Sequence, residues 1–129
     1  TWIAQVNIGP AVVNMVSGDI FVDGVGQAGR SVKLINMVTG AKVPTNTDTN
    51  GHYEFSPVAN GTYKINISLN LAAPGTVSGH LEVNALPEVG KKVKIKLQGT
   101  DITDANGDFS IANVAAGPRK VVITNVDVP

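Results

Sequence analysis

The chain has 129 residues, of which 43% are hydrophobic and only 16% are charged, and its 10 acidic residues balance its 10 basic residues. This length is enough for one core of ordinary size or two small ones, and the charge balance gives no reason to expect a nucleic-acid partner. The chain has no cysteine, which excludes disulfides and cysteine-ligated metals and is typical of an extracytoplasmic protein. No apolar run approaches the roughly 18 residues of a membrane-spanning helix.

The first segment, residues 1–15, has the sequence TWIAQVNIGPAVVNM. It is rich in valine and shows no helical periodicity, so an extended conformation is predicted. Because it lies outside the repeats described next, we interpret it as a candidate donor strand, which would add to the edge of a sheet in its own or a neighbouring molecule. The side chains expected to make this interaction are Trp2, Ile3, Val6, Ile8, Val12 and Val13.

The rest of the chain contains one unit twice, at residues 16–71 and 77–129. The clearest match is TDTNGHYEF at residues 47–55, which recurs as TDANGDFSI at residues 103–111. The two copies align with a single change in length, in the loop that precedes this phrase. A length change confined to a loop is typical of a duplicated structural unit.

Both copies are predicted to be β-structure. Apolar residues alternate with others over short segments that end in Gly, Pro or Asn-Gly, which is the pattern of strands with one buried face. The residues that this alternation places in the core are Tyr53, Phe55, Tyr63, Ile65, Phe109, Ile111, Val121 and Ile123.

The repeated phrase has two interpretations. Asp48 and Asp104 are placed to accept backbone N–H groups of the turn that follows them, and Asn-Gly supplies the positive φ angles that a tight turn needs. In the second copy Asp101, Asp104, Asn106 and Asp108 also place several oxygen ligands in one loop, which suits Ca²⁺. We favour the turn, because the first copy is poorer in acidic residues. No other cofactor is expected.

The two copies resemble the carboxypeptidase regulatory-like domain, a transthyretin-like β-sandwich related to Cna B-type repeats. The resemblance implies two tandem small antiparallel β-sandwiches that act as non-catalytic scaffolds of extracellular proteins. Against the family pattern each copy looks one strand short, and Arg119 stands where an aromatic residue is expected. The matching positions are Val16, Gly18, Ile20, Val32, Leu34, Thr47, Asp48, Gly51, Tyr53, Phe55, Gly61, Tyr63, Ile65 and Ile67, and then Val77, Gly79, Leu81, Val93, Ile95, Thr103, Asp104, Gly107, Phe109, Ile111, Gly117, Val121 and Ile123.

Enzyme chemistry has little basis in this sequence. His52 and His80 are interpreted as surface residues rather than a metal pair, since the two copies do not share them. Cna B-type relatives can form a Lys–Asn isopeptide bond assisted by a buried acid. Lys33 and Lys94 occupy equivalent strand positions in the two copies, as do Lys64 and Lys120, but they fall on the outward phase and are interpreted as solvated strand lysines. Asn60 and Asn66 begin glycosylation sequons, so glycans are conceivable partners.

The resulting expectation is a non-catalytic structural protein located outside the cell or on its surface. It would be a subunit of a self-assembling fibre or surface layer, joined by β-strand donation from residues 1–15. The alternative is an accessory module of a larger secreted hydrolase or receptor, which helps folding or contacts substrate.

Overall fold

The computed structural model describes residues 14–129, and these form an all-β sandwich of two antiparallel sheets. The twelve strands are β1 (Asn14–Val22), β2 (Val25–Gly26), β3 (Ser31–Asn36), β4 (Lys42–Asn46), β5 (His52–Val58), β6 (Gly61–Leu71), β7 (Gly75–Val83), β8 (Leu86–Pro87), β9 (Lys92–Ile95), β10 (Gly99–Ile102), β11 (Asp108–Val114) and β12 (Gly117–Val128).

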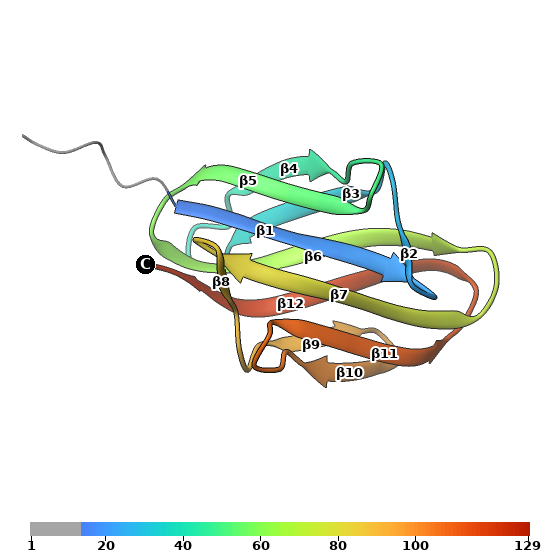
Figure 1. Cartoon of the computed structure of the whole chain (residues 1–129). Coiled ribbons are helices and arrows are strands. Elements are labelled where there is room, and N and C mark those ends of the chain that lie inside the picture. The colour runs from blue at the N-terminus through green and yellow to red at the C-terminus, as the bar shows by residue number, and fades with distance from the viewer. Residues whose placement is uncertain (1–13) are drawn as a thin grey trace, which may run out of the picture.

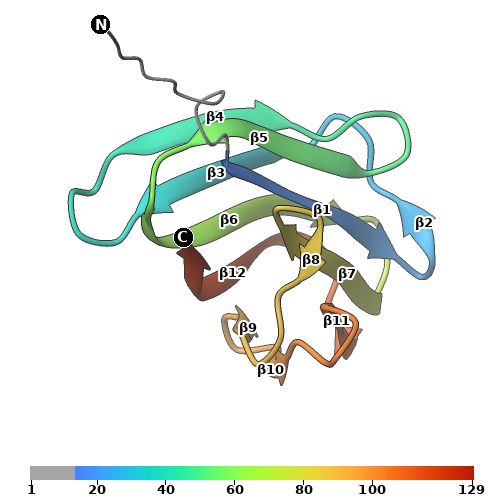
Figure 2. The same ribbon diagram turned by 60° about the vertical axis from the view of Figure 1, so that its left-hand side comes forward.

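The strands of each copy are divided between the two sheets. Sheet A has the order β5-β1-β7-β11, with the short β2 and β8 paired to β1 and β7. Sheet B has the order β4-β3-β6-β12-β9-β10. Figure 1 shows β1 and β7 side by side in the centre of sheet A. The turned view in Figure 2 shows β4 beside β5 at one edge of the sandwich and β10 near β11 at the other.

The two copies are related by an approximate twofold axis. In sheet A, Gly18 pairs with Leu81 and Ile20 with Gly79, so that equivalent residues of the two copies face each other in exchanged positions. In sheet B the same exchange relates the β6–β12 pairs, which join residues 65 and 67 to residues 123 and 121. The axis therefore passes through the central strand pair of both sheets.

This arrangement corrects the expectation of two separate small sandwiches. Each copy contributes one half of both sheets, and the buried side chains of both copies form one core cluster. All eight residues that the alternation places in the core are buried. The physical reason for the fusion is that β1 and β6 alone would leave their inner edges unpaired, and β7 and β12 satisfy those backbone groups.

The missing strand of each copy has the same explanation. Each copy looked one strand short of the family pattern. The place beside β6 is filled by β12 of the other copy. The strand count therefore no longer argues for donation from residues 1–15. The structure also adds two strands that the sequence did not predict, β4 and β10, in the segments that we expected to be loops.

Close packing against the neighbouring strands explains the glycine of the repeated Val-Ser-Gly, at positions 18 and 79. A Cβ atom on Gly79 would lie 2.6 Å from Cζ of Phe109, and a Cβ atom on Gly18 would overlap the ring of Tyr53 in the same way. The same Cβ atoms would also overlap a backbone oxygen of the other central strand, with Asp19 O 2.5 Å from the Cβ on Gly79 and His80 O even closer to the Cβ on Gly18. Since real Cβ atoms do not approach this closely, only glycine leaves room for both the neighbouring backbone and the aromatic ring. The glycine of each Val-Ser-Gly motif is thus required in part by the aromatic residue that follows Asn-Gly in the same copy.

Candidate assembly surfaces

The repeated phrase forms the same turn in both copies. Asp48 Oδ1 accepts hydrogen bonds from the backbone N–H groups of Asn50, at 2.8 Å, and His52, at 3.0 Å. Asp104 Oδ1 accepts the equivalent bonds from residues 106 and 108, at 2.9 and 3.0 Å. These backbone hydrogen bonds lower the pKa of both aspartates. The prediction of a turn that satisfies itself is confirmed.

The four calcium candidates do not converge on one point. Asp104 is directed to its own turn, Asp101 Oδ2 accepts the Ser110 N–H at 2.7 Å, and Asp108 Oδ1 lies 2.7 Å from His80 Nδ1. Asn106 contributes a backbone N–H rather than a ligand oxygen. Within residues 14–129 no group of three or more His, Cys, Asp or Glu side chains is placed to hold a metal ion.

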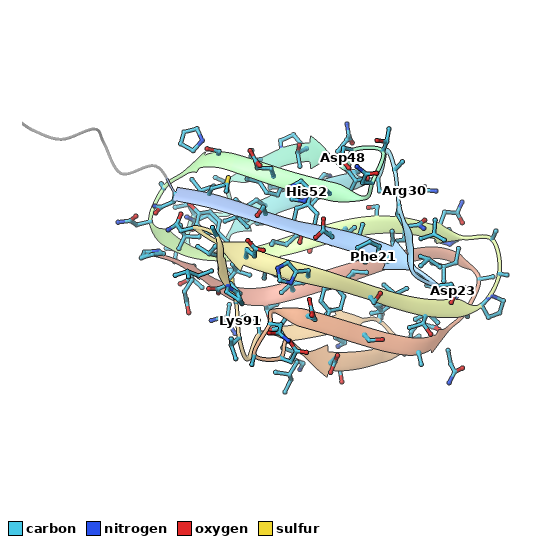
Figure 3. The ribbon with its side chains drawn as sticks, viewed as in Figure 1. Phe21, Asp23, Arg30, Asp48, His52 and Lys91 are labelled. Atoms are coloured by element: carbon cyan, nitrogen blue, oxygen red, sulfur yellow. The ribbon has the colours of Figure 1, made fainter. Side chains whose placement is uncertain are left out.

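The outer face of sheet A carries a row of alternating histidines and aspartates. From β5 to β11 the directly paired residues are His52, Asp19, His80 and Asp108. His52 Nδ1 lies 2.8 Å from Asp19 Oδ1, and the equivalent His80–Asp108 pair is 2.7 Å apart. Figure 3 shows His52 on this face, as its outward phase predicted.

This row contains an exchange that sequence reasoning missed. In the first copy β1 supplies the aspartate and β5 the histidine, whereas in the second copy β7 supplies the histidine and β11 the aspartate. The signal was present in the alignment of the copies, in which Asp19 matches His80 and His52 matches Asp108. The two histidines, which looked unrelated, belong to equivalent cross-strand His–Asp pairs, one in each copy, with the positions of the two residue types exchanged.

His80 is the more enclosed of the two histidines, and its Nε2 also lies 2.7 Å from Glu82 Oε2. Partial burial lowers the pKa of His80, but the hydrogen bonds to Glu82 and Asp108 outweigh this effect, so its pKa is raised. With Glu54 on β5, the face gathers four carboxylates, and the strands of sheet A carry no lysine or arginine. We call this surface, with Asp19, Glu54, Glu82 and Asp108, the acidic face.

The outer face of sheet B has the opposite charge. The lysines of β3, β6, β9 and β12 alternate with buried residues and point outward, as predicted for Lys33 and Lys94. Ile35 lies on the same side, between Lys42 and Lys64 of the adjacent strands, and is only 7% exposed. We call this surface the lysine face; its residues are Lys33, Lys42, Lys64, Lys92, Lys94 and Lys120.

The two side edges of the sandwich are closed differently. Between β10 and β11, Asp101 bonds to the Ser110 N–H, and near the ends of these strands Gln98 Oε1 accepts the Ala115 N–H at 2.7 Å. A hollow of about 310 Å³ remains at this edge, and three of the residues that line it are aspartates, Asp101, Asp104 and Asp108. Between β4 and β5 there is instead an apolar groove of about 320 Å³. We call it the β4–β5 groove, and its apolar lining is Leu34, Val43, Phe55, Pro57, Val58 and Tyr63.

The predicted donor residues Trp2, Ile3, Val6, Ile8, Val12 and Val13 lie outside the described residues. The last two residues of the predicted segment, Asn14 and Met15, belong to β1, which corrects its boundary. Asn14 Nδ2 donates to the backbone oxygen of Val58 at 3.0 Å and to Asn60 Oδ1 at 2.8 Å. Since Val58 also lines the β4–β5 groove, β1 begins next to one end of it.

Comparison of the chain with family models, curated proteins and solved structures gave no match. The resemblance to carboxypeptidase regulatory-like domains therefore stays a prediction. In the part of the chain that the structure describes, no helix has the length and apolar character needed to cross a membrane.

Proposed function

We propose that this chain is a non-catalytic structural subunit of an extracellular fibre or surface layer. Subunits are joined when residues 1–13 of one copy add as a strand at the β4–β5 groove of the next. The observation that carries the proposal is the difference between the two edges of the sandwich, one bridged by polar hydrogen bonds and lined by aspartates and the other lined by apolar side chains.

The groove has the chemistry that strand addition requires. On the groove side β4 and β5 have no strand partner within residues 14–129, so these edges can accept a further strand, although Pro44 and Pro57 have no N–H to donate. The lining is apolar, and Val43 is 52% exposed at its rim. An added strand would gain main-chain hydrogen bonds at the edge and would bury alternate side chains in the groove. Residues 1–13 supply such side chains, because Trp2, Val6 and Ile8 would fall on one face of an extended strand.

One donor and one acceptor per molecule set the form of the assembly. Donor and groove are different surfaces, so the contact is heterologous, and a heterologous contact that does not close into a ring gives an open filament. Donation into the groove of the same molecule is the competing outcome, because β1 begins beside the groove. The experiment has to separate these two cases.

The test compares three proteins: the full chain, a form that lacks residues 1–13, and the full chain with Val43→Asp. The deletion stops before Asn14 because this residue anchors β1. Val43→Asp places a charge at the rim of the groove without touching the buried core. In about 1 M salt, which screens contacts between charged surfaces, we expect multi-angle light scattering to show polymers for the full chain only, with unchanged far-ultraviolet circular dichroism for all three.

Two outcomes would end the proposal. A full chain that stays monomeric at high concentration would show that any donation occurs within one molecule. Polymers that persist in both variants would show that residues 1–13 and the groove are not the contact. A synthetic peptide of residues 1–13 gives a further check, since it should bind the deleted form and should not bind the Val43→Asp protein.

A further inference from the structure

The charges of this molecule are balanced in number but separated in space. The strands of sheet A hold acidic residues, two histidines and no lysine or arginine. The strands of sheet B hold six lysines and Arg119, with Asp101 and Asp127 as their acidic residues. Neither aspartate neutralises the lysine face, because Asp101 bonds to Ser110 of β11 and Asp127 lies 2.8 Å from Lys91. The net charge of zero therefore hides two opposite patches.

The two patches lie on opposite outer surfaces and have similar extents. The acidic face spans the four strands β5-β1-β7-β11, and at about 4.8 Å between strands the row of paired side chains is about 15 Å wide. On the lysine face, Lys33 and Lys94 are the ends of a cross-strand row through Asn66 and Val122, which covers the same number of strands. Patches of matching width and opposite sign are electrostatically complementary.

The acidic face is also smooth enough for close approach. Most of its uncharged outward positions are small, and the larger side chains among them are Met15 and Phe21, near the two ends of β1 (Figure 3 shows Phe21). The small residues are Ser17, Ser56, Ser78, Ser110 and Ala112. Long lysine side chains from a facing molecule could reach the carboxylates over this surface without a steric obstacle.

We propose that copies of this chain stack laterally, with the acidic face of one molecule against the lysine face of the next. Stacking of two like faces is disfavoured by repulsion between charges of the same sign. Because the complementary patches are on opposite sides of one molecule, each stacked copy presents a fresh face, and the contact repeats without closing. This contact differs from strand addition at the β4–β5 groove and does not depend on it.

A second copy is the partner that the charges favour. A polyanion would satisfy the lysine face and would leave the acidic face unexplained, whereas a second copy satisfies both. Exposed ion pairs contribute only about 0–1 kcal/mol each, so one stacked pair is weak and sensitive to salt. Along a filament the same contact is repeated for every subunit, and the repeats add to strong lateral association.

Charge reversal with mixing is the decisive experiment. One protein carries Lys33→Glu with Lys94→Glu, and the other carries Glu54→Lys with Glu82→Lys; all four positions are on strand surfaces. Self-association is followed by static light scattering in about 0.01 M and about 1 M salt, where the screening lengths are about 30 Å and 3 Å. Arg30 lies in a loop outside both faces, and Arg30→Glu lowers the net charge by half as much as the double lysine reversal; it tests whether a charge reversal outside the faces affects association.

We expect attraction between native molecules at low salt, its loss at high salt, and its loss at low salt in each reversed protein. An equimolar mixture of the two reversed proteins should regain it, and Arg30→Glu should keep it. Failure of the mixture to associate would overturn the proposal, as would association that is indifferent to salt. Binding of a model polyanion by the native lysine face, without attraction between native molecules, would assign that face to another partner.

Electron microscopy separates this inference from the proposed function. Filaments that form but never bundle at low salt would refute lateral stacking and leave strand addition standing. Salt-sensitive clusters that persist after deletion of residues 1–13 would support stacking and leave strand addition without support.

Discussion

A mutation in the second copy should unfold the first copy if the core is shared. Phe109 is the informative position, because its ring is buried to 3% exposure and packs over Gly79. Burial of an aromatic side chain removes about 150–250 Å² from water, at about 25 cal/mol per Å². With the cavity that remains, Phe109→Ala should lower the free energy of unfolding by about 3–5 kcal/mol.

The chain carries its own reporter for the first copy. Its two tyrosines, Tyr53 and Tyr63, are both in that copy and both buried. In a Trp2→Phe background their fluorescence follows the unfolding of the first copy in urea, while circular dichroism follows all strands. For a denaturant slope of about 2 kcal/mol/M, the midpoint should fall by about 1.5–2.5 M.

Coincidence of the two signals is the test. One shared core predicts that tyrosine fluorescence and circular dichroism shift together in Phe109→Ala. A tyrosine transition that stays at the parental midpoint would refute the fused sandwich and restore two independent units. Ile102→Ala is the matched control, because this second-copy side chain is 62% exposed and its truncation should change the free energy by no more than about 0.5 kcal/mol.

Three further predictions follow from individual contacts. Tyr53→Phe should raise the free energy of unfolding by about 1–3 kcal/mol, because the buried hydroxyl has no hydrogen-bond partner within residues 14–129; a loss of stability in urea would show that it has one. Gly79→Ala should cost about 1–3 kcal/mol through overlap with the Asp19 backbone oxygen and the Phe109 ring, and a double-mutant cycle with Phe109→Leu should reveal the part that is due to the ring; additive effects would contradict the contact with Phe109. Asp104→Ala should lower the melting temperature at neutral pH, and because the folded-state pKa of Asp104 is lowered, the difference from the parent should shrink as pH falls below about 4; a difference that is constant with pH would show that the ionised carboxylate is not what stabilises the turn.

Local features of this fold could be predicted from the sequence because local physics determines them. The alternation of apolar residues placed Tyr53 and Phe109 in the core, and the spacing of Asp48 from Asn-Gly fixed the turn. These features depend on residues within one strand or one turn. The candidate donor residues could not be checked in the same way, since they lie outside the described part of the chain.

Pairing between the two copies could not be predicted, because self-similarity does not say whether a strand pairs within its own copy or with the other. The short edge strands β4 and β10 were missed for a different reason. An edge strand with one weakly buried face shows little alternation, and Pro44 in β4 argues against a strand in any position except an edge. The exchanged His–Asp pairs were visible in the alignment but acquire meaning only from the strand register.

The divergence of the copies matters for assembly more than their similarity. A symmetric sandwich would have two equivalent grooves, at β4–β5 and β10–β11, for the one N-terminal segment of each chain. The second copy instead bridges its edge with the Asp101–Ser110 and Gln98–Ala115 hydrogen bonds, and the hollow that remains there is lined by aspartates, which do not suit an apolar donor strand. One acceptor then matches one donor, which is the condition for growth in a single direction. Asp101→Ala with Gln98→Ala should therefore open a second acceptor edge and produce branched or irregular polymers in electron micrographs, and unchanged linear filaments would show that these bonds do not control the number of acceptor sites.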